Sequence, residues 1–307
     1  MQMGKCEESK IIYNTKTLEK IAYEPDAILQ DEESFWQDER PQQLTKLWAK
    51  SVNYPIHYDK GRKKMREWAD IPLFKRKDHI FMENAKKIID GKQEFLENAL
   101  PHLCSYLPKD ADLNVTAHFT AFIPSRAFAH EDIVVNVNAD YWKNNVDNIL
   151  NTLIHEIFHA GYGYCRDVRT EERLKDENLY SMLDNLHNEG ICTYVGYKAL
   201  SAFPAPDEKD YKLIDNMSEV ERLLKDVNEV FSKIGNLSKE ELQKLVWEKC
   251  VIGRGYYVVG ALMCRVIEEK KGRKGLIETL TEGPVSFLKL YNSLVKKEMQ
   301  LQIKLQL

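Results

Sequence analysis

The stretch Thr152-Leu153-Ile154-His155-Glu156-Ile157-Phe158-His159-Ala160 decides how the rest of the chain has to be arranged. Its surroundings are typical of an amphipathic helix, in which apolar residues recur at steps of three and four positions. These residues are Val146, Ile149, Leu150, Leu153, Ile157 and Phe158. We expect the helix to begin near Asn144 and to end at Gly161 or Gly163, since glycine commonly ends helices.

Within this predicted helix the sequence reads His-Glu-x-x-His. Residues four positions apart share one face of a helix, so His155 and His159 can bind one metal ion together. Glu156 follows the first histidine and points away from the metal, which suits a base that acts on metal-bound water. Zinc fits best, because two histidines and a carboxylate leave its fourth position open. Chance occurrence of the pattern is the minor alternative.

A third ligand is expected on the next helical pattern, residues 177–200. Glu189 lies far enough beyond His159 for a turn and an antiparallel helix to bring it back. Gly190 removes a side chain where the two helices have to approach closely. The alternative is an exposed helix glutamate, and His187 and Asp184 are weaker rivals for the same position.

Three short segments before the metal helix are rich in β-forming residues: 113–122, 126–130 and 132–138. We expect them to form a small, mostly antiparallel sheet packed on the metal helix. His118 and His130 lie on these strands. Each is either an extra metal ligand or an ordinary surface or hydrogen-bonded histidine.

The predicted fold class is therefore α+β, predominantly α, with helical regions on both sides of the metal site. We divide the chain into an N-terminal helical region at 1–110, a zinc-binding core at 111–200 and a C-terminal helical region at 201–307. Residues 1 to about 24 are polar, and we expect partial disorder there. Trp36, Trp48 and Trp68 are expected to be core anchors.

The metal-site region resembles the gluzincins, the thermolysin-like zinc metallopeptidases, over residues 113–200. The matching pieces are His155-Glu156-x-x-His159, the later Asn188-Glu189 pair and a two-strand element before the metal helix. The Glu189-Gly190 form and the longer gap are more similar to poorly characterised families of zinc-dependent peptidases than to thermolysin.

This resemblance implies further roles. In gluzincins an edge strand pairs with the bound peptide, and Ala127, Phe128 and Ala129, preceded by Arg126, stand in the corresponding place. The family also carries an aspartate four residues after the glutamate ligand, which orients the first histidine. Thr193 stands there instead, and its hydroxyl is a weaker partner for His155.

The resemblance also implies an oxyanion donor from the C-terminal third of the chain. Tyr257, Tyr256 or Arg254 can serve, because a phenol or a guanidinium aimed at developing negative charge stabilises it. Two core aromatic residues at a helix start are an equally good reading of the tyrosines.

Composition excludes several other classes of function. The formal net charge is −4 and no basic patch stands out, so nucleic acid is not an expected partner. No apolar run reaches membrane-spanning length and the first ten residues are polar, so we expect a cytoplasmic protein without a membrane partner. The six cysteines form no Cys-x-x-Cys pair, and we expect buried, reduced thiols.

The resulting hypothesis is a zinc metallopeptidase that acts on peptides or small proteins, with Glu156 as general base. Two alternatives remain open. One is a zinc hydrolase of a non-peptide substrate, and the other is a helical binding protein with a structural or vacant metal site.

Overall fold

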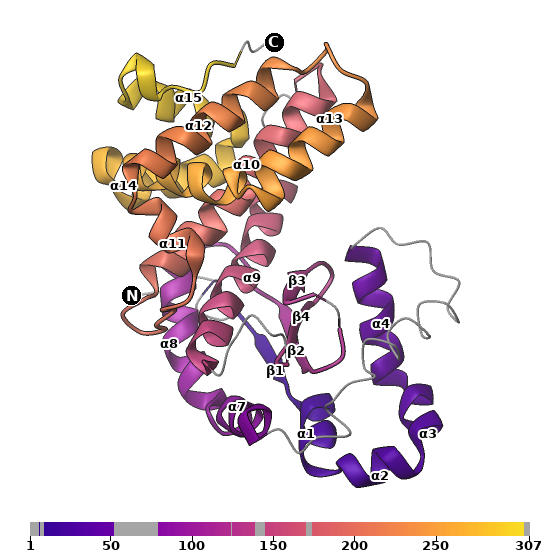
Figure 1. Cartoon of the computed structure of the whole chain (residues 1–307). Helices are drawn as coiled ribbons and strands as arrows, with labels where there is room; N and C mark the ends of the chain where they lie inside the picture. Colours follow the sequence, from indigo (N-terminus) through magenta and orange to yellow (C-terminus); the bar gives the residue numbers. More distant parts are fainter. Residues whose placement is uncertain are drawn as a thin grey trace.

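The computed structural model describes residue 6 and residues 9–51, 79–123, 125–138, 145–169 and 174–303. Trp68 lies outside these residues, as does Asn144, the predicted start of the metal helix. The fold is α+β and predominantly α, as predicted (Figure 1). In Figure 1 the N-terminal helices and the sheet occupy the lower end, helices α12–α15 the upper end, and α9 lies between them.

The N-terminal part consists of one strand and a series of helices. They are β1 (Ile11–Asn14), α1 (Lys16–Tyr23), α2 (Pro25–Gln30), α3 (Glu32–Gln37), α4 (Glu39–Ser51), α7 (His79–Asp90) and α8 (Lys92–Cys104). The expectation of disorder before residue 24 is wrong for residues 9–23, because Ile11, Tyr13, Leu18 and Ile21 are buried and tie this segment to the core. Trp36 and Trp48 are buried, which confirms them as core residues.

The sheet has four strands in the order β1-β2-β4-β3. The other three strands are β2 (Val115–Thr120), β3 (Ala127–Ala129) and β4 (Ile133–Asn136). β1 and β4 both pair with β2 in parallel, and only β3 pairs with β4 antiparallel. The prediction of a mostly antiparallel sheet is therefore wrong. β4 lies between β2 and β3, so β3 is at the edge of the sheet. β1 comes from a distant part of the sequence and pairs with the other side of β2.

Helix α9 (Val146–Asp167) carries the His-Glu-x-x-His motif and contacts β2, β3 and β4. The Asn145 side chain caps its start by accepting a hydrogen bond of 3.1 Å from the Asp147 backbone. The helix continues past Gly161 and Gly163, so the prediction that either glycine ends it is wrong. A Cβ on Gly161 would lie 2.7 Å from the Leu107 side chain, so this glycine permits close packing instead.

Helices α10 (Glu177–Lys198) and α14 (Gly255–Glu282) make the most extensive helix contact in the described structure. They cross where Gly190 meets Gly260: a Cβ on Gly190 would lie 2.4 Å from the Gly260 Cα. Gly190 thus permits the approach of α10 to α14, whereas the sequence suggested an approach to the metal helix. The remaining elements are α11 (Lys209–Ile214), α12 (Met217–Ser232), α13 (Lys239–Val246), the π-helix η3 (Trp247–Ile252), α15 (Pro284–Leu294) and the 3-10 helix η4 (Lys297–Met299).

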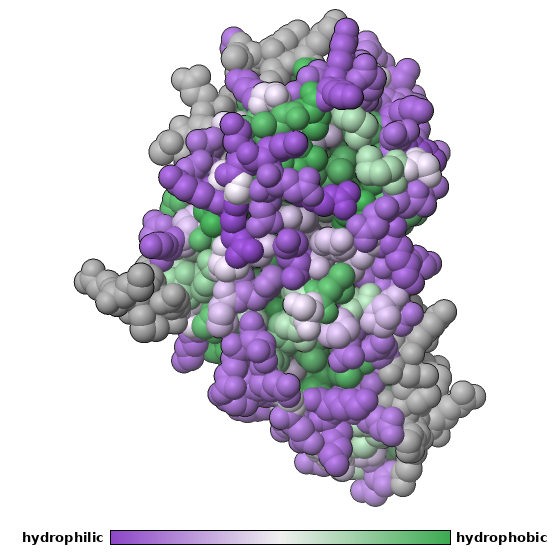
Figure 2. Space-filling view, turned by 90° about the vertical axis from the view of Figure 1, so that its left-hand side faces the viewer, coloured by the Kyte–Doolittle hydropathy of each residue, from purple (hydrophilic) through white to green (hydrophobic). Residues whose placement is uncertain are grey.

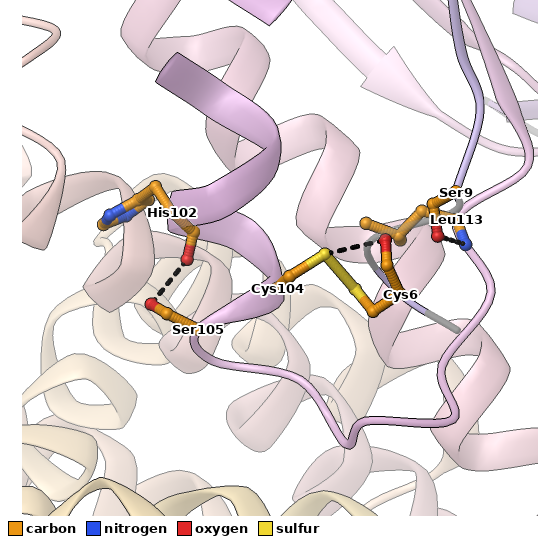
Figure 3. The surroundings of a disulfide bond; sticks show 6 residues. All are labelled: Cys6, Ser9, His102, Cys104, Ser105 and Leu113. Carbon is orange, nitrogen blue, oxygen red and sulfur yellow. Dashed lines mark hydrogen bonds between the residues drawn. A yellow bond between two sulfur atoms is a disulfide. The ribbon is translucent and has the colours of Figure 1, made fainter. Parts of the chain in front are cut away.

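Cys6 and Cys104 form a disulfide that joins the start of the chain to the end of α8 (Figure 3). The expectation of six reduced thiols is wrong for this pair. The two cysteines are 98 positions apart, and no known cysteine motif has that spacing, so the sequence alone does not reveal the pair. The other four cysteines, at 165, 192, 250 and 264, are buried and free.

The face of the molecule in Figure 2 is mostly hydrophilic, and hydrophobic residues show between the hydrophilic ones in separate groups. Within the described residues, no single helix has the length and apolar composition needed to cross a membrane. One bent pair, Lys239–Ile252 with Gly255–Glu282, passes that test of length and composition when the two helices are taken together.

Candidate metal centre

Three side chains from two helices bring their donor atoms together. His155 and His159 on α9 place their Nε2 atoms 3.1 Å apart. One oxygen of Glu189 on α10 lies 3.5 Å from the first of these nitrogens and 3.6 Å from the second. Zinc binds nitrogen and oxygen at about 2.0–2.2 Å, so tetrahedral ligand atoms stand about 3.3–3.6 Å apart. The two distances to Glu189 fall in this range, and the 3.1 Å between the nitrogens is slightly shorter, so the three donors are close to the spacing of three corners of a zinc tetrahedron.

Charge and burial act in opposite directions on this cluster. Burial lowers the pKa of His155, but the hydrogen bond to Glu189 and the charges of Glu156 and Glu189 outweigh it, so the pKa is raised. Burial raises the pKa of Glu189, and the neighbouring histidines and Arg254 outweigh it, so that pKa is lowered. The carboxylate is therefore kept ionised, which is the form that binds a metal.

Asn188 sets the orientation of His159. The Nδ1–H of His159 donates a hydrogen bond to the Asn188 side-chain oxygen at 2.9 Å. The other ring nitrogen, Nε2, therefore carries the lone pair that can bind a metal, and it faces Glu189. Cys192 also lies against this ring, with its sulfur 3.3 Å from Nδ1. Burial raises the pKa of the Cys192 thiol well above its usual value, and its sulfur does not belong to the described cluster of donor atoms.

The support of His155 differs from that of His159. The Thr193 hydroxyl is buried and makes no hydrogen bond to any described residue, so it is not seen holding the imidazole. A small cavity of about 10 Å³ lies beside the two residues, and its lining includes Thr193, His155, Glu208 and Asp210.

A half-open cleft of about 890 Å³ contains the cluster. Glu156 is 8% exposed and lines this cleft together with His155, His159 and Glu189. Ala127, Phe128 and Ala129 of β3 form part of a wall and are partly exposed. β3 is an edge strand, since its only described partner is β4.

The two tyrosines proposed from the sequence lie in different places. Tyr257 lines the cleft, and its ring stacks on the ring of His155 with a centroid distance of 6.3 Å. Tyr256 is only 3% exposed and lies outside the lining of the cleft. The structure therefore brings Tyr257 to the cluster and places Tyr256 in the core.

The rival ligands have other partners. Asp184 binds the Arg169 guanidinium at 2.7 Å. His187 is fully buried, stacks on Phe287 and contacts the Thr279 hydroxyl. His118 bonds Asp132 at 3.1 Å, as in the hydrogen-bonded reading, and His130 lies in the cleft wall away from the donor cluster.

Sequence reasoning did not single out Trp247, Glu208 or Asp210. Trp247 lines the cleft and is 58% exposed, and its position beside Glu248 and Lys249 in a charged stretch is the signal that it is not a core residue. Glu208 and Asp210 bind Arg126 and Arg254 of the cleft wall. Their positions at the start of α11 do not mark them as site residues in the sequence, because acidic residues are common at helix starts.

Comparison with known proteins adds one match. Residues 24–300 match the family described as "Putative zinc dependent peptidase (DUF5700)". No curated protein and no solved structure matches the chain. A zinc cofactor agrees with the described His, His, Glu cluster. Because the match spans most of the sequence, this chain belongs to the DUF5700 family of putative zinc dependent peptidases.

Proposed function

We propose that this protein is a gluzincin-like zinc metallopeptidase that hydrolyses peptide bonds. The observation that carries the proposal is the placement of Glu156 in one cleft with three donors at zinc spacing. The family description supports a zinc peptidase at the coarser level. A bound zinc ion would supply an activated water and polarise the scissile carbonyl.

Each residue of the metal centre then has a defined role. His155, His159 and Glu189 would hold the metal, and Asn188 would keep His159 in the tautomer that exposes Nε2. The Glu156 carboxylate would accept a proton from the attacking water and pass it to the leaving amine.

The walls of the cleft would bind and orient the substrate. Main-chain groups of the edge strand Ala127–Ala129, on the side away from β4, would pair with an extended peptide. The Tyr257 phenol, which lines the cleft beside His155, would donate to the oxygen on which negative charge develops. The cleft volume of about 890 Å³ suits a short peptide segment.

The test combines metal analysis with one substitution. Purified protein should contain about one zinc per chain and hydrolyse members of a peptide library. Glu156→Gln should retain the zinc and lose turnover, because an amide cannot accept the proton. Glu269→Gln, an exposed change on α14, is the control and should behave as wild type.

Other results would support other functions. Hydrolysis of esters but not of peptides would indicate a zinc hydrolase of a different substrate class. Chelator-induced unfolding without turnover on any substrate would indicate a structural metal site. Wild-type peptide hydrolysis by Glu156→Gln would contradict the role given to this carboxylate.

A further inference from the structure

The junction between η3 and α14 has an unusual backbone conformation. Arg254 has φ 67° and ψ 16°, the left-handed region, and it is the one non-glycine residue with positive φ in the part of the chain that the structure describes. An L-residue pays a conformational cost there that glycine avoids. Such residues cluster at functional sites.

Glycines flank this position on both sides, yet they serve a different purpose. A Cβ on Gly253 would lie 2.5 Å from the Lys249 carbonyl oxygen, and one on Gly255 would lie 2.8 Å from Val227. Both glycines are therefore required by close packing. The chain carries glycine where space is short and arginine where the backbone favours glycine, so the Arg254 side chain itself has a use.

That side chain contacts two elements, α11 and α14. The Arg254 Nε donates to the Asp210 carboxylate at 2.9 Å, and a terminal nitrogen donates to the second oxygen. Asp210, on the first turn of α11, has a side chain only 6% exposed, so its position is firmly held. The guanidinium carbon lies 3.3 Å from the centre of the Tyr257 ring, which is cation–π contact.

The contacts continue to the metal centre. The Tyr257 ring also stacks on the ring of His155 at an interplanar angle of 21°, so one ring contacts both the guanidinium and a proposed metal ligand. Arg254, Tyr257 and His155 all line the cleft. We propose that Arg254 is a positioning residue: anchored on Asp210, it holds the Tyr257 phenol beside the metal centre. This inference rests on the proposed function, in which that phenol donates to the oxyanion.

Removing Arg254 alone would leave the buried Asp210 carboxylate without its partner and would risk misfolding. The test variant is therefore the pair Arg254→Gly with Asp210→Asn, which removes both charges and relieves the backbone. The matched control is Arg265→Ala with Asp215→Asn. It removes another arginine–aspartate pair, 3.2 Å apart between α14 and the end of α11, that does not line the cleft.

Tyrosine replaced by 3-fluorotyrosine provides a readout that needs no turnover. The ¹⁹F resonance of Tyr257 is assigned by its loss in Tyr257→Phe, and we expect it away from the free-amino-acid position in the wild type. In the Arg254→Gly/Asp210→Asn variant it should move toward that position and broaden. In the control pair it should not move. An unmoved Tyr257 resonance in the test variant overturns the proposal.

Kinetics on a cleaved peptide provide the second readout. Tyr257→Phe should lower kcat about 100-fold, the usual effect of losing one oxyanion donor. The Arg254→Gly/Asp210→Asn variant should lower kcat similarly, with KM and zinc content unchanged, and adding Tyr257→Phe should cause little further loss. Unchanged kcat, or losses that multiply, overturns the proposal. A moved resonance in a protein without any peptidase activity would leave the holding of the ring intact and reject the proposed function.

Discussion

Asn188 is the side chain that decides which nitrogen of His159 faces Glu189. It accepts the Nδ1–H bond at 2.9 Å, and the Asn188 side chain is itself contacted by the Cys192 thiol at 3.6 Å. Partners of this kind fix the tautomer and ring orientation of a metal-binding histidine before the metal arrives. The affinity for zinc should therefore depend on a residue that does not touch the metal.

Asn188→Ala should weaken zinc binding about 10- to 100-fold, because His159 loses its orienting acceptor. Competition with a chromophoric chelator measures the zinc Kd. Asn188→Asp keeps an acceptor oxygen and should stay closer to wild type, so it serves as the matched control. Equal zinc Kd values for Asn188→Ala and the wild type would show that the hydrogen bond has no orienting role.

At the level of helices, the position of α10 connects the metal centre to the C-terminal half. Glu189 reaches the histidines of α9 while the next residue, Gly190, lies against Gly260 of α14. The absence of both side chains lets the two backbones approach, and α14 in turn brings Tyr257 into the cleft. Packing between α10 and α14 and the geometry of the metal centre are thus coupled.

Gly190→Ala should destabilise the fold by about 1–3 kcal/mol or more, because the new methyl group meets backbone atoms that cannot move aside. Gly163→Ala is the matched control on α9: a Cβ there would meet no atom within 4 Å. That change should stabilise the helix by about 0.5–1 kcal/mol. Urea unfolding measures both free energies, and equal values for the two variants would contradict the close approach of α10 to α14.

At the scale of the whole molecule, the disulfide closes a covalent loop between residues 98 positions apart. Cys6 joins Cys104 at the end of α8, and nearby the Leu113 backbone donates to the Ser9 hydroxyl at 2.9 Å (Figure 3). The link therefore fastens the segment that leads into β1 to the segment that leads into β2. These two strands pair in parallel.

Reduction should lower the free energy of unfolding by about 2–4 kcal/mol, because the unfolded chain regains the freedom of a long loop. Urea unfolding with and without dithiothreitol measures this difference. The Cys6→Ser/Cys104→Ser variant is the control and should not respond to the reductant. Thiol titration of the unfolded, unreduced protein should find four free cysteines, and six would contradict the disulfide.

The disulfide also bears on the cellular location. Disulfides persist in oxidising compartments and are rare in the cytosol. The cytoplasmic location expected from the polar first residues remains a prediction. Finding the Cys6–Cys104 bond in protein trapped directly from its native cells would argue against it.

Local patterns were sufficient for part of the site. The three- and four-residue periodicity around His155 predicts the helix, and helix geometry alone places His155 and His159 on one face. The density of β-forming residues at 113–122, 126–130 and 132–138 predicts three strands for a similar reason, and β2, β3 and β4 lie within these segments. Each of these features depends on neighbours within one or two turns of the chain.

Features that join distant segments required the folded chain. The parallel pairing of β1 with β2, the disulfide and the contact of Asp210 with Arg254 each connect residues more than 40 positions apart. Glu189 lies between the two cases: its place on the next helical pattern after His159 suggests it, and the packing of α10 brings it to the histidines. Short-range periodicity specifies which side of an element is apolar, whereas the choice of partner depends on how all the apolar faces pack together.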